Sequence, residues 1–445
     1  MPLLKLAIIF AGIVLLLSRN WNLGLVLMLA SLAVGLMFAY PLPAIGWDVL
    51  VTSVDPLTLR LALSVVLIMT LSELLRQTGR LQGMVESLQV LIPSGRLVIA
   101  ALPSLVGLLP MVGGAMFSAP MVDEVGDKLG VDQERKTFVN YWFRHIWEYI
   151  FPLYPSLMLG AALLGLETLQ LSSAAWPLTA TAVAGGLVFG LIGIPGHRAP
   201  RQSFEARLES LRTLAASVWP VVMVIILSLI LPVDERLTLI LSLLTAITLL
   251  MALERLSVRT LGCILRYRIP WESIVVLFGA LVFRRVLDNS GAVWAVSDAL
   301  TRSPVPLAVV AFLVPFVAGL LTGLSTAAFS IGFPVVLPLV AVDGTAISPG
   351  WAAWLLAGGF LGVMCSPLHL CLSLTRVYFH AEWAPIYRRI APATLVVVVT
   401  ATVLLLGREY FVHLLGIEGI LFEEGIFFEL AHTTSLAEFL ALCYN

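Results

Sequence analysis

Charged side chains are scarce in this chain. Only 12% of its 445 residues are Asp, Glu, Lys or Arg, whereas 60% are hydrophobic. Soluble domains carry about 25% charged residues, so this scarcity excludes soluble enzymes, nucleic-acid-binding proteins and disordered scaffolds. The near balance of 26 basic and 27 acidic side chains indicates no polyanionic partner such as nucleic acid. The composition predicts a polytopic membrane protein whose main partner is the lipid bilayer.

Cysteine and enzyme signatures are also missing. The four cysteines (Cys263, Cys365, Cys371 and Cys443) form no CxxC pair and no framework spacing, so neither a zinc site nor disulfides are predicted. His145 and Glu148 could place two metal ligands on one helix face, but the HExxH pattern of metalloproteases is absent, as are GxSxG and phosphate-binding glycine loops. We therefore expect no enzyme, no bound metal and no cofactor beyond Na⁺ or H⁺ as a coupling ion.

Long apolar runs are abundant. A helix needs about 20 apolar residues to cross the hydrocarbon core of a bilayer. The sequence predicts ten such crossings, at 3–18, 22–40, 57–76, 137–165, 173–194, 216–232, 237–254, 270–289, 350–376 and 388–407.

Two further apolar stretches, 97–122 and 305–340, are interrupted midway by small residues. We interpret both as re-entrant hairpins that enter and leave by the same membrane face. The alternative is that each is a single kinked crossing. The predicted fold class is thus an all-α membrane protein with ten transmembrane helices and two re-entrant hairpins.

The distribution of Lys and Arg supports this count, because cytoplasmic loops retain basic residues. With both termini outside the cytoplasm, most loop Lys and Arg fall inside, and the outer loops contain only Arg236, Arg302 and Arg408. A full crossing at either hairpin would move every later loop to the other side and remove this asymmetry. We therefore predict a multi-pass protein of the cytoplasmic membrane with both termini and an acidic tail, 408–445, extracytoplasmic.

The chain also repeats itself. With a shift of 212 residues, residues 107–120 align with 319–332 without a gap, and six of the fourteen positions are identical. Each half then has five crossings, an odd number, so the second copy is predicted to be inverted. The predicted divisions are a first repeat (1–196), a cytoplasmic linker (197–215), a second repeat (216–407) and the tail. Inverted repeats with broken helices are typical of secondary transporters, which bind substrate near the membrane midplane.

The hairpin tips are candidate substrate-binding segments. Backbone groups freed from helical bonding inside a membrane must be satisfied by protein or water, so interruptions in both halves indicate a shared polar cavity. Glycine lets the backbone approach a ligand closely, and the hydroxyls of the second tip can contact it, although membrane Ser and Thr also bond their own helix. The candidates at the tips are Gly113, Gly114, Thr322, Gly323, Ser325 and Thr326.

The first broken helix carries ionisable groups before Pro152 and Pro155. Such groups at membrane depth are costly and mark functional sites. Glu148 is the leading candidate for a proton-coupling carboxylate or ion ligand, with Asn140, Arg144 and His145 beside it. A purely structural Arg144–Glu148 pair, one helical turn apart, is the alternative.

The second broken helix contains Ser366, Pro367 and His369, which we predict to contact substrate. A histidine directly after a break can bind substrate or a proton, or can be a hydrogen-bonded packing residue. Sequence leaves both interpretations open.

Three strings carry a resemblance to known proteins: LPMVGGAMFSAPMVDE, NYWFRHIWEYIFPLYP and SPLHLCLSLT. They resemble a prokaryotic integral-membrane family known only as a family of unknown function, number 401. The two hairpin-plus-broken-helix units look like the ion transporter superfamily of divalent-anion symporters, gluconate permeases and arsenite-efflux subunits. The resemblance implies a homodimer in which a transport domain moves against a scaffold. The symporters carry a Ser-Asn-Thr sodium signature at the hairpin tips; both tips here lack the Asn, which favours proton coupling.

The expected function is secondary active transport of a small anionic solute, driven by a proton or sodium gradient. The expected moving domain is formed by the hairpins 97–122 and 305–340 with the broken helices 137–165 and 350–376, against helices 3–40 and 216–254. A cation/proton antiporter or an inorganic-anion efflux protein is the alternative, and a passive channel is a more distant one.

Overall fold

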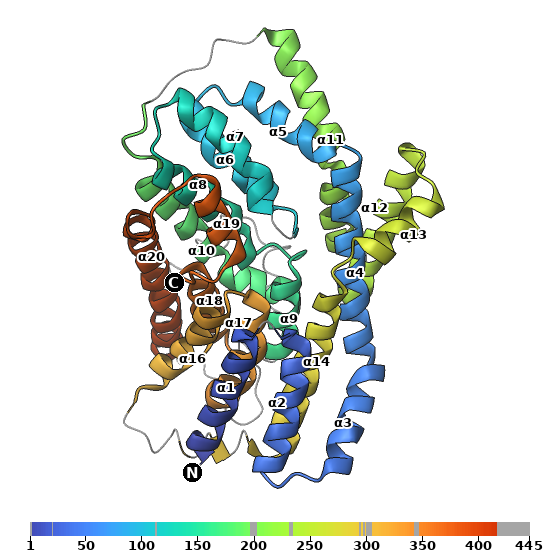
Figure 1. Cartoon of the computed structure of the whole chain (residues 1–445), viewed down its shortest axis with the longest axis vertical. Coiled ribbons are helices and arrows are strands. Elements are labelled where there is room, and N and C mark those ends of the chain that lie inside the picture. The colour runs from blue at the N-terminus through green and yellow to red at the C-terminus, as the bar shows by residue number, and fades with distance from the viewer. Residues whose placement is uncertain are drawn as a thin grey trace.

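The computed structural model describes residues 2–19, 21–111, 114–195, 203–230, 235–292, 295, 296, 299, 305–341 and 347–415. Within these ranges the chain forms nineteen α-helices and no strand (Figure 1). Gly113, linker residues 196–202 and the acidic tail beyond 415 lie outside the described residues. The chain is an all-helical protein, as its composition predicts.

One group of helices lies mainly on the right of Figure 1. In this group α2 packs along α14, α11 packs against α5 and α12, and α12 packs against α4. Helices α2 and α14 approach closely because Gly24 and Gly279 face each other, and a Cβ on Gly279 would lie 2.5 Å from the Gly24 carbonyl oxygen. The members are α2 (Leu23–Met37), α3 (Leu42–Val54), α4 (Pro56–Gln77), α5 (Arg80–Leu91), α11 (Phe204–Ile230), α12 (Glu235–Leu253), α13 (Val258–Tyr267) and α14 (Trp271–Asn289).

The second group fills the left of Figure 1. Its most extensive contact is between α16 and α18. Helix α20 packs between α18 and α10 and contacts both. Helix α1 (Pro2–Ser18) lies along α2 and touches α16, and so lies at the edge of both groups. The members are α6 (Gly95–Gly107), α7 (Gly114–Lys128), α8 (Gln133–His145), α9 (Pro155–Leu164), α10 (Thr168–Gly186), α16 (Leu307–Thr322), α17 (Ser325–Val340), α18 (Pro349–Met364), α19 (Leu370–Tyr378) and α20 (Trp383–Leu415).

Each interrupted apolar stretch forms two helices that pack against each other. Helix α6 lies against α7, and α16 lies against α17. A single kinked crossing would carry its two halves away from each other, so the contact along both pairs identifies helical hairpins. The second pair turns at Gly323, which has a φ of +67°, a conformation that favours glycine.

The two stretches predicted as broken helices are indeed broken. Helix α8 gives way to a 3₁₀ turn, Ile146–Tyr149, and the chain is irregular until α9 begins at Pro155. Proline at the first position of a helix is favoured, because its missing N–H has no partner there in any case. In the second half α18 ends at Met364 and α19 begins at Leu370.

Three segments predicted to lie between crossings contain helices. The loop at 41–56 contains α3, the linker at 197–215 already contains the start of α11 at Phe204, and the segment between predicted crossings 237–254 and 270–289 contains α13. These helices are short or continue into polar residues, so a search for runs of about 20 apolar residues passes over them. Helix α13 shows the pattern most clearly, with Arg259 and Arg266 on an otherwise apolar ten-residue segment.

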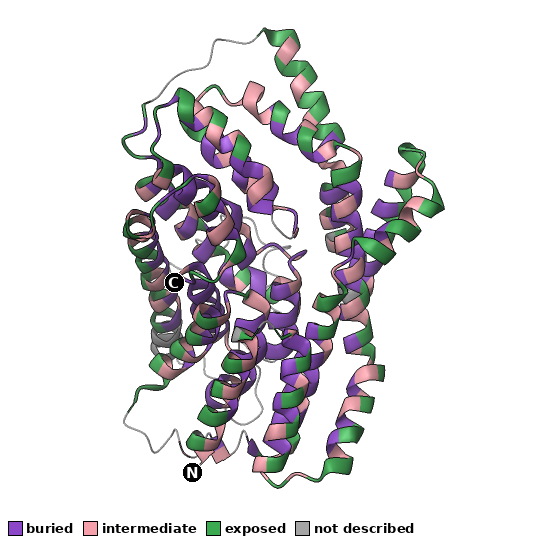
Figure 2. Cartoon of the chain, in the orientation of Figure 1, coloured by how far each residue is buried: buried purple, intermediate pink, exposed green. Residues whose placement is uncertain are grey.

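Four helices are long and apolar enough to cross a membrane as single elements: Pro56–Gln77, Thr168–Leu191, Phe204–Ser228 and Trp383–Gly407. Most other apolar helices in the described ranges have 10 to 17 residues. Large apolar side chains are exposed on the outer helices, such as Leu36, Leu395 and Val403, each 61–62% exposed, while buried residues gather in the middle (Figure 2). An apolar exterior of this kind is suited to lipid.

Helices α16 and α18 contact each other through glycine. A Cβ on Gly358 would lie 2.6 Å from the Phe312 carbonyl oxygen, and one on Gly319 would meet the Gly359 carbonyl. Small residues that let backbones approach are typical of helix contacts in membranes. The interface therefore leaves no room for a larger side chain.

We expect Gly358→Val to lower the free energy of unfolding by about 1–3 kcal/mol, the usual range for overpacking. Thermal unfolding of the purified protein measures this loss. Gly46→Ala in α3 is the control, because a Cβ there meets nothing within 4 Å. Equal stability of the two variants would contradict the close contact.

Candidate functional site: a cavity at the helix interruptions

The four interruptions, two hairpin tips and two broken helices, meet around one cavity. Its volume is about 240 Å³. One wall comes from the tips and breaks, with Met111, Glu148, Ser325 and His369 among its residues, and the opposite wall comes from α4 and α14. The cavity thus lies between the two helix groups and is built from both halves of the chain.

Arg144, at the end of α8, places a buried guanidinium at this cavity. Only 3% of the residue is exposed, and Nη2 donates to the Met111 carbonyl oxygen at 2.9 Å. Its Nε has no hydrogen-bond partner among the described residues. Gly114 is needed for this placement, because a Cβ there would lie 2.7 Å from the guanidinium nitrogens. Gly114 therefore makes room for Arg144 and does not line the cavity.

Glu148 connects the two halves. Its Oε2 accepts a hydrogen bond from Ser325 Oγ at 3.2 Å, and its Oε1 lies 3.9 Å from Arg144 Nη1 and 3.8 Å from His145 Nε2. The Arg144–Glu148 ion pair considered from the sequence is present, but only at the long end of the range for an ion pair. The closer partner of the carboxylate is the tip of the second hairpin.

His369 lies across from His145. Its Nδ1 is 2.6 Å from the Gly323 carbonyl oxygen, and its Nε2 is 3.1 Å from His145 Nε2. His145 Nδ1 in turn is 2.6 Å from the Tyr141 carbonyl oxygen. A carbonyl oxygen can only accept, so both Nδ1 atoms carry their hydrogens.

Gly323 holds the second tip against His369. Besides its positive φ, a Cβ on this residue would lie 2.6 Å from the His369 backbone nitrogen. The tip and the break of α18–α19 are therefore in backbone contact. This contact sets the position of the His369 ring at the cavity.

Helix N-termini at the cavity have no side-chain caps. Helices α9, α17 and α19 begin at Pro155, Ser325 and Leu370, and none of them has a side-chain cap hydrogen bond. The first N–H groups of a helix have no partner within the helix, and they carry the positive end of the helix dipole. These three residues all line the cavity.

The freed carbonyl groups, in contrast, are satisfied. Side chains donate to the carbonyls where the preceding helices end: Arg144 to Met111, Ser366 to Leu320, His369 to Gly323, Tyr154 to Gly107, Tyr141 to Met364 and Tyr387 to Cys365. The interruptions therefore have their acceptors occupied while donors stay open. The cavity therefore receives the Arg144 guanidinium and the positive ends of three helix dipoles, beside the Glu148 carboxylate.

Some predicted site residues bond other parts of the protein and are not among the residues that line the cavity. Asn140 is fully buried and bonds Ser118, Ala115 and Thr375. Thr322 donates to the Ala318 carbonyl of its own helix, the alternative considered for hydroxyls at this tip.

Ser366 donates to the Leu320 carbonyl, and Pro367 is exposed and accepts from Ser373 through its carbonyl. None of Asn140, Gly114, Thr322, Ser366 and Pro367 lines the cavity, whereas Thr326 does.

Sequence reasoning missed Cys371 and Tyr154. Cys371 lies in the first turn of α19 and reaches the cavity beside both histidines. Its sequence signal is its position two residues after His369, because it belongs to no cysteine spacing motif. Tyr154 closes the first break with its hydrogen bond to Gly107.

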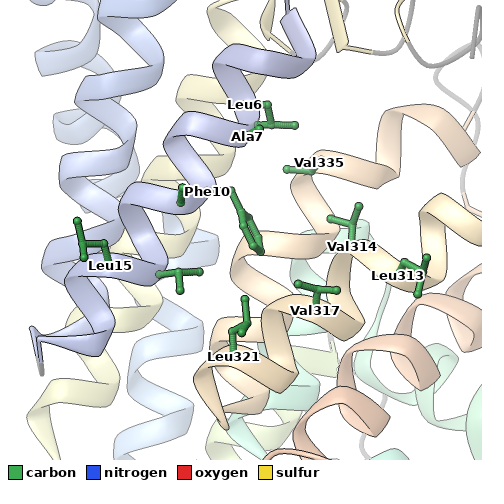
Figure 3. Close-up of a pocket in the computed structure, with 11 residues that line it drawn as sticks. Leu6, Ala7, Phe10, Leu15, Leu313, Val314, Val317, Leu321 and Val335 are labelled. Atoms are coloured by element: carbon green, nitrogen blue, oxygen red, sulfur yellow. The ribbon is translucent and has the colours of Figure 1, made fainter.

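A second, larger cavity is apolar throughout. It measures about 800 Å³ and lies between α1 and the pair α16–α17, lined by side chains such as Phe10, Val317 and Leu321 (Figure 3). Its walls carry no polar or charged side chain, so a polar solute would lose its hydrogen bonds there without compensation. In a membrane such a space suits a lipid chain, and the polar cavity is the better candidate site.

The fold and its apolar exterior define the chain as a helical membrane protein. Its sequence matches, over residues 3–407, the model of the family described as protein of unknown function DUF401, and the chain belongs to that family. No curated protein matches the chain.

We expect Gly323→Ala to be more destabilising than Gly130→Ala. Both glycines have positive φ, +67° and +63°, so an alanine pays about 1–2 kcal/mol of backbone strain at either site. At Gly323 the new Cβ also collides with the backbone of His369, whereas a Cβ at Gly130 has no atom within 4 Å. The difference in unfolding free energy between the two variants, measured by thermal unfolding, isolates the contact between residue 323 and His369. Equal losses of stability would contradict this contact.

Proposed function

We propose that the protein is a secondary active transporter for a small anionic solute, coupled to a proton or sodium gradient. One observation carries this proposal: three uncapped helix N-termini and the Arg144 guanidinium face a single cavity between the two helix groups. A helix N-terminus stabilises an anion by about 0.3–1 kcal/mol at an exposed surface and by more where water is excluded. Several N-termini with one arginine are well suited to a carboxylate or an oxyanion.

The helix bounds support the two repeats. Helices α2 and α6 begin at Leu23 and Gly95, and their counterparts α12 and α16 begin at Glu235 and Leu307, 212 residues later in each case. After the three-residue slip in the alignment, α9 and α19 begin at Pro155 and Leu370, 215 residues apart. With five crossings in each half, the second repeat would be inverted, as in many transporters with broken helices at the membrane midplane.

The contact pattern supports an elevator movement. Hairpins and broken helices pack among themselves, and the cavity lies between them and α4 and α14 of the other group. The hydrogen bond from Ser325 to Glu148 and the contact between the His145 and His369 rings join the two halves of the chain within the group of hairpins and broken helices. We propose that this group moves as a body and carries the solute past α4 and α14, within a homodimer of the kind expected from the sequence.

Glu148 is the proposed site of the coupling cation. It is the carboxylate at the cavity, it is 9% exposed, and its nearest hydrogen-bond partner among the described residues is the neutral hydroxyl of Ser325. A cation that binds this carboxylate favours entry of an anion beside it. Both tips lack the Asn of the sodium signature, which favours the proton as that cation.

Reconstitution into proteoliposomes tests the function. A panel of small carboxylates and inorganic oxyanions is offered under an imposed pH or sodium gradient, and accumulation of at least one above its equilibrium level is expected. Equilibration without accumulation would identify a passive channel. Proton or sodium exchange in the absence of every anion would identify the alternative, a cation/proton antiporter.

We expect Glu148→Gln and Ser325→Ala to abolish accumulation, and Arg144→Gln to weaken solute binding by about 10–100-fold. Hydrogen bonds to charged groups contribute about 1.5–3 kcal/mol, which corresponds to that factor. The controls are Glu124→Gln, an exposed carboxylate, and Ser53→Ala, whose hydroxyl bonds its own helix. Full transport by the three cavity variants would show that the site is elsewhere.

The proposed topology places ten crossings between two extracytoplasmic termini. Exposed Cys263 in α13 should then be cytoplasmic, and Cys443, separated from it by three crossings, should be outside. A membrane-impermeant maleimide should label the Cys443→Ser variant only in inverted vesicles and the Cys263→Ser variant only in spheroplasts. Labelling of both variants from one side would contradict the crossing count.

A further inference from the structure

The histidine pair at the cavity presents two bare nitrogen atoms to each other. Both Nδ1 atoms donate to backbone carbonyls, so the Nε2 atoms of neutral rings carry only lone pairs. These atoms are 3.1 Å apart. Two lone pairs at this distance repel each other unless a hydrogen-bond donor, such as the neighbouring Cys371 thiol, or a cation lies between or beside them.

Arg144 satisfies this requirement only in part. Its Nη1 lies 3.3 Å from His145 Nε2, a long contact. His369 Nε2 has the His145 ring and the Cys371 thiol as its neighbours, and neither of them is a cation. The pair therefore has room for a bound cation.

Cys371 adds a third ligand atom. Its Sγ and the two imidazole nitrogens all lie within 4.8 Å of one another. In a tetrahedral zinc site, bond lengths of about 2.0–2.3 Å place neighbouring ligand atoms roughly 3.3–3.6 Å apart. The two nitrogens are already near this separation, and a shift of about 1 Å brings the sulfur to it.

The surroundings of the rings match those of metal ligands. A metal-binding histidine usually donates its other ring N–H to a carbonyl or carboxylate, which orients the ring, and His145 and His369 both do so. Two imidazoles with one thiolate favour zinc over magnesium or calcium, which prefer oxygen. The Glu148 carboxylate, 3.8 Å from His145 Nε2, adds negative charge nearby.

We propose that His145, His369 and Cys371 form a Zn²⁺ site at the wall of the cavity, with a fourth coordination position that faces the cavity. Three protein ligands and one open position are typical of zinc sites that bind water or a small anion. The three ligands come from α8, from the break after α18 and from α19, so the ion would link elements of both halves. The proposal goes beyond the transport function and does not depend on which solute is carried.

Co²⁺ binding to the full-length protein, purified in detergent and freed of metal by a chelator, tests the site without any transport assay. We expect one Co²⁺ per chain, with a thiolate-to-cobalt charge-transfer band and the visible bands of tetrahedral cobalt, and we expect Zn²⁺ to displace it. Cys371→Ser should abolish the charge-transfer band. His369→Gln should weaken binding at least about 100-fold, since loss of an outer-shell partner alone costs 10–100-fold.

Controls separate the site from adventitious binding. Cys263→Ser and Cys365→Ser should retain the full spectrum, because neither cysteine belongs to the cluster. A cooperative thermal unfolding transition shows that each variant is folded. If Cys371→Ser does not fold, His369→Gln still tests the site, because it removes a different ligand and keeps the thiol. The proposal is overturned if the spectrum survives Cys371→Ser. It is also overturned if no saturable Co²⁺ binding occurs, which is the result expected if the two histidines share a proton and bind no metal.

Discussion

Unpaired backbone groups are the constraint on which the rest of this structure depends. Each interruption of a helix in an apolar bundle frees both donors and acceptors, and each unsatisfied group costs several kcal/mol in a hydrocarbon environment. Here the acceptors are satisfied internally: tyrosines, a serine, a histidine and Arg144 donate to the carbonyls at the helix ends. The donors at the starts of α9, α17 and α19 receive no side chain. This imbalance leaves backbone N–H groups, at the positive ends of helix dipoles, around the cavity.

The same constraint explains why both halves of the chain are needed. Carbonyls freed in one hairpin are bonded by side chains from the broken helix of the same half, as with Tyr154 and Gly107 or His369 and Gly323. The ionisable groups then join the halves, because Glu148 bonds Ser325 and His145 faces His369. Neither half by itself would enclose the cavity.

Much of this arrangement could be predicted from the sequence. Proline and glycine marked the interruptions, and ionisable residues within apolar segments marked Arg144, His145, Glu148 and His369, all of which line the cavity. The direction of a side chain could not be read in the same way. Asn140 is on the same helix as Arg144, yet its side chain bonds α7 and α19 and does not line the cavity. Gly114 leaves space for the Arg144 guanidinium, and this contact joins segments that are distant in the sequence. Helices α3 and α13 were missed because hydrophobic length alone does not reveal short helices.

The glycine contact between α16 and α18 restricts how the cavity can open. Backbones that touch through Gly319, Gly358 and Gly362 pack closely over several turns, so separation of the two helices would lose this contact. The tip that bears Ser325 and the break that bears His369 are consequently fixed to one another through their parent helices. A swing of this hairpin alone would break that contact, whereas α4 and α14, which also line the cavity, take no part in it.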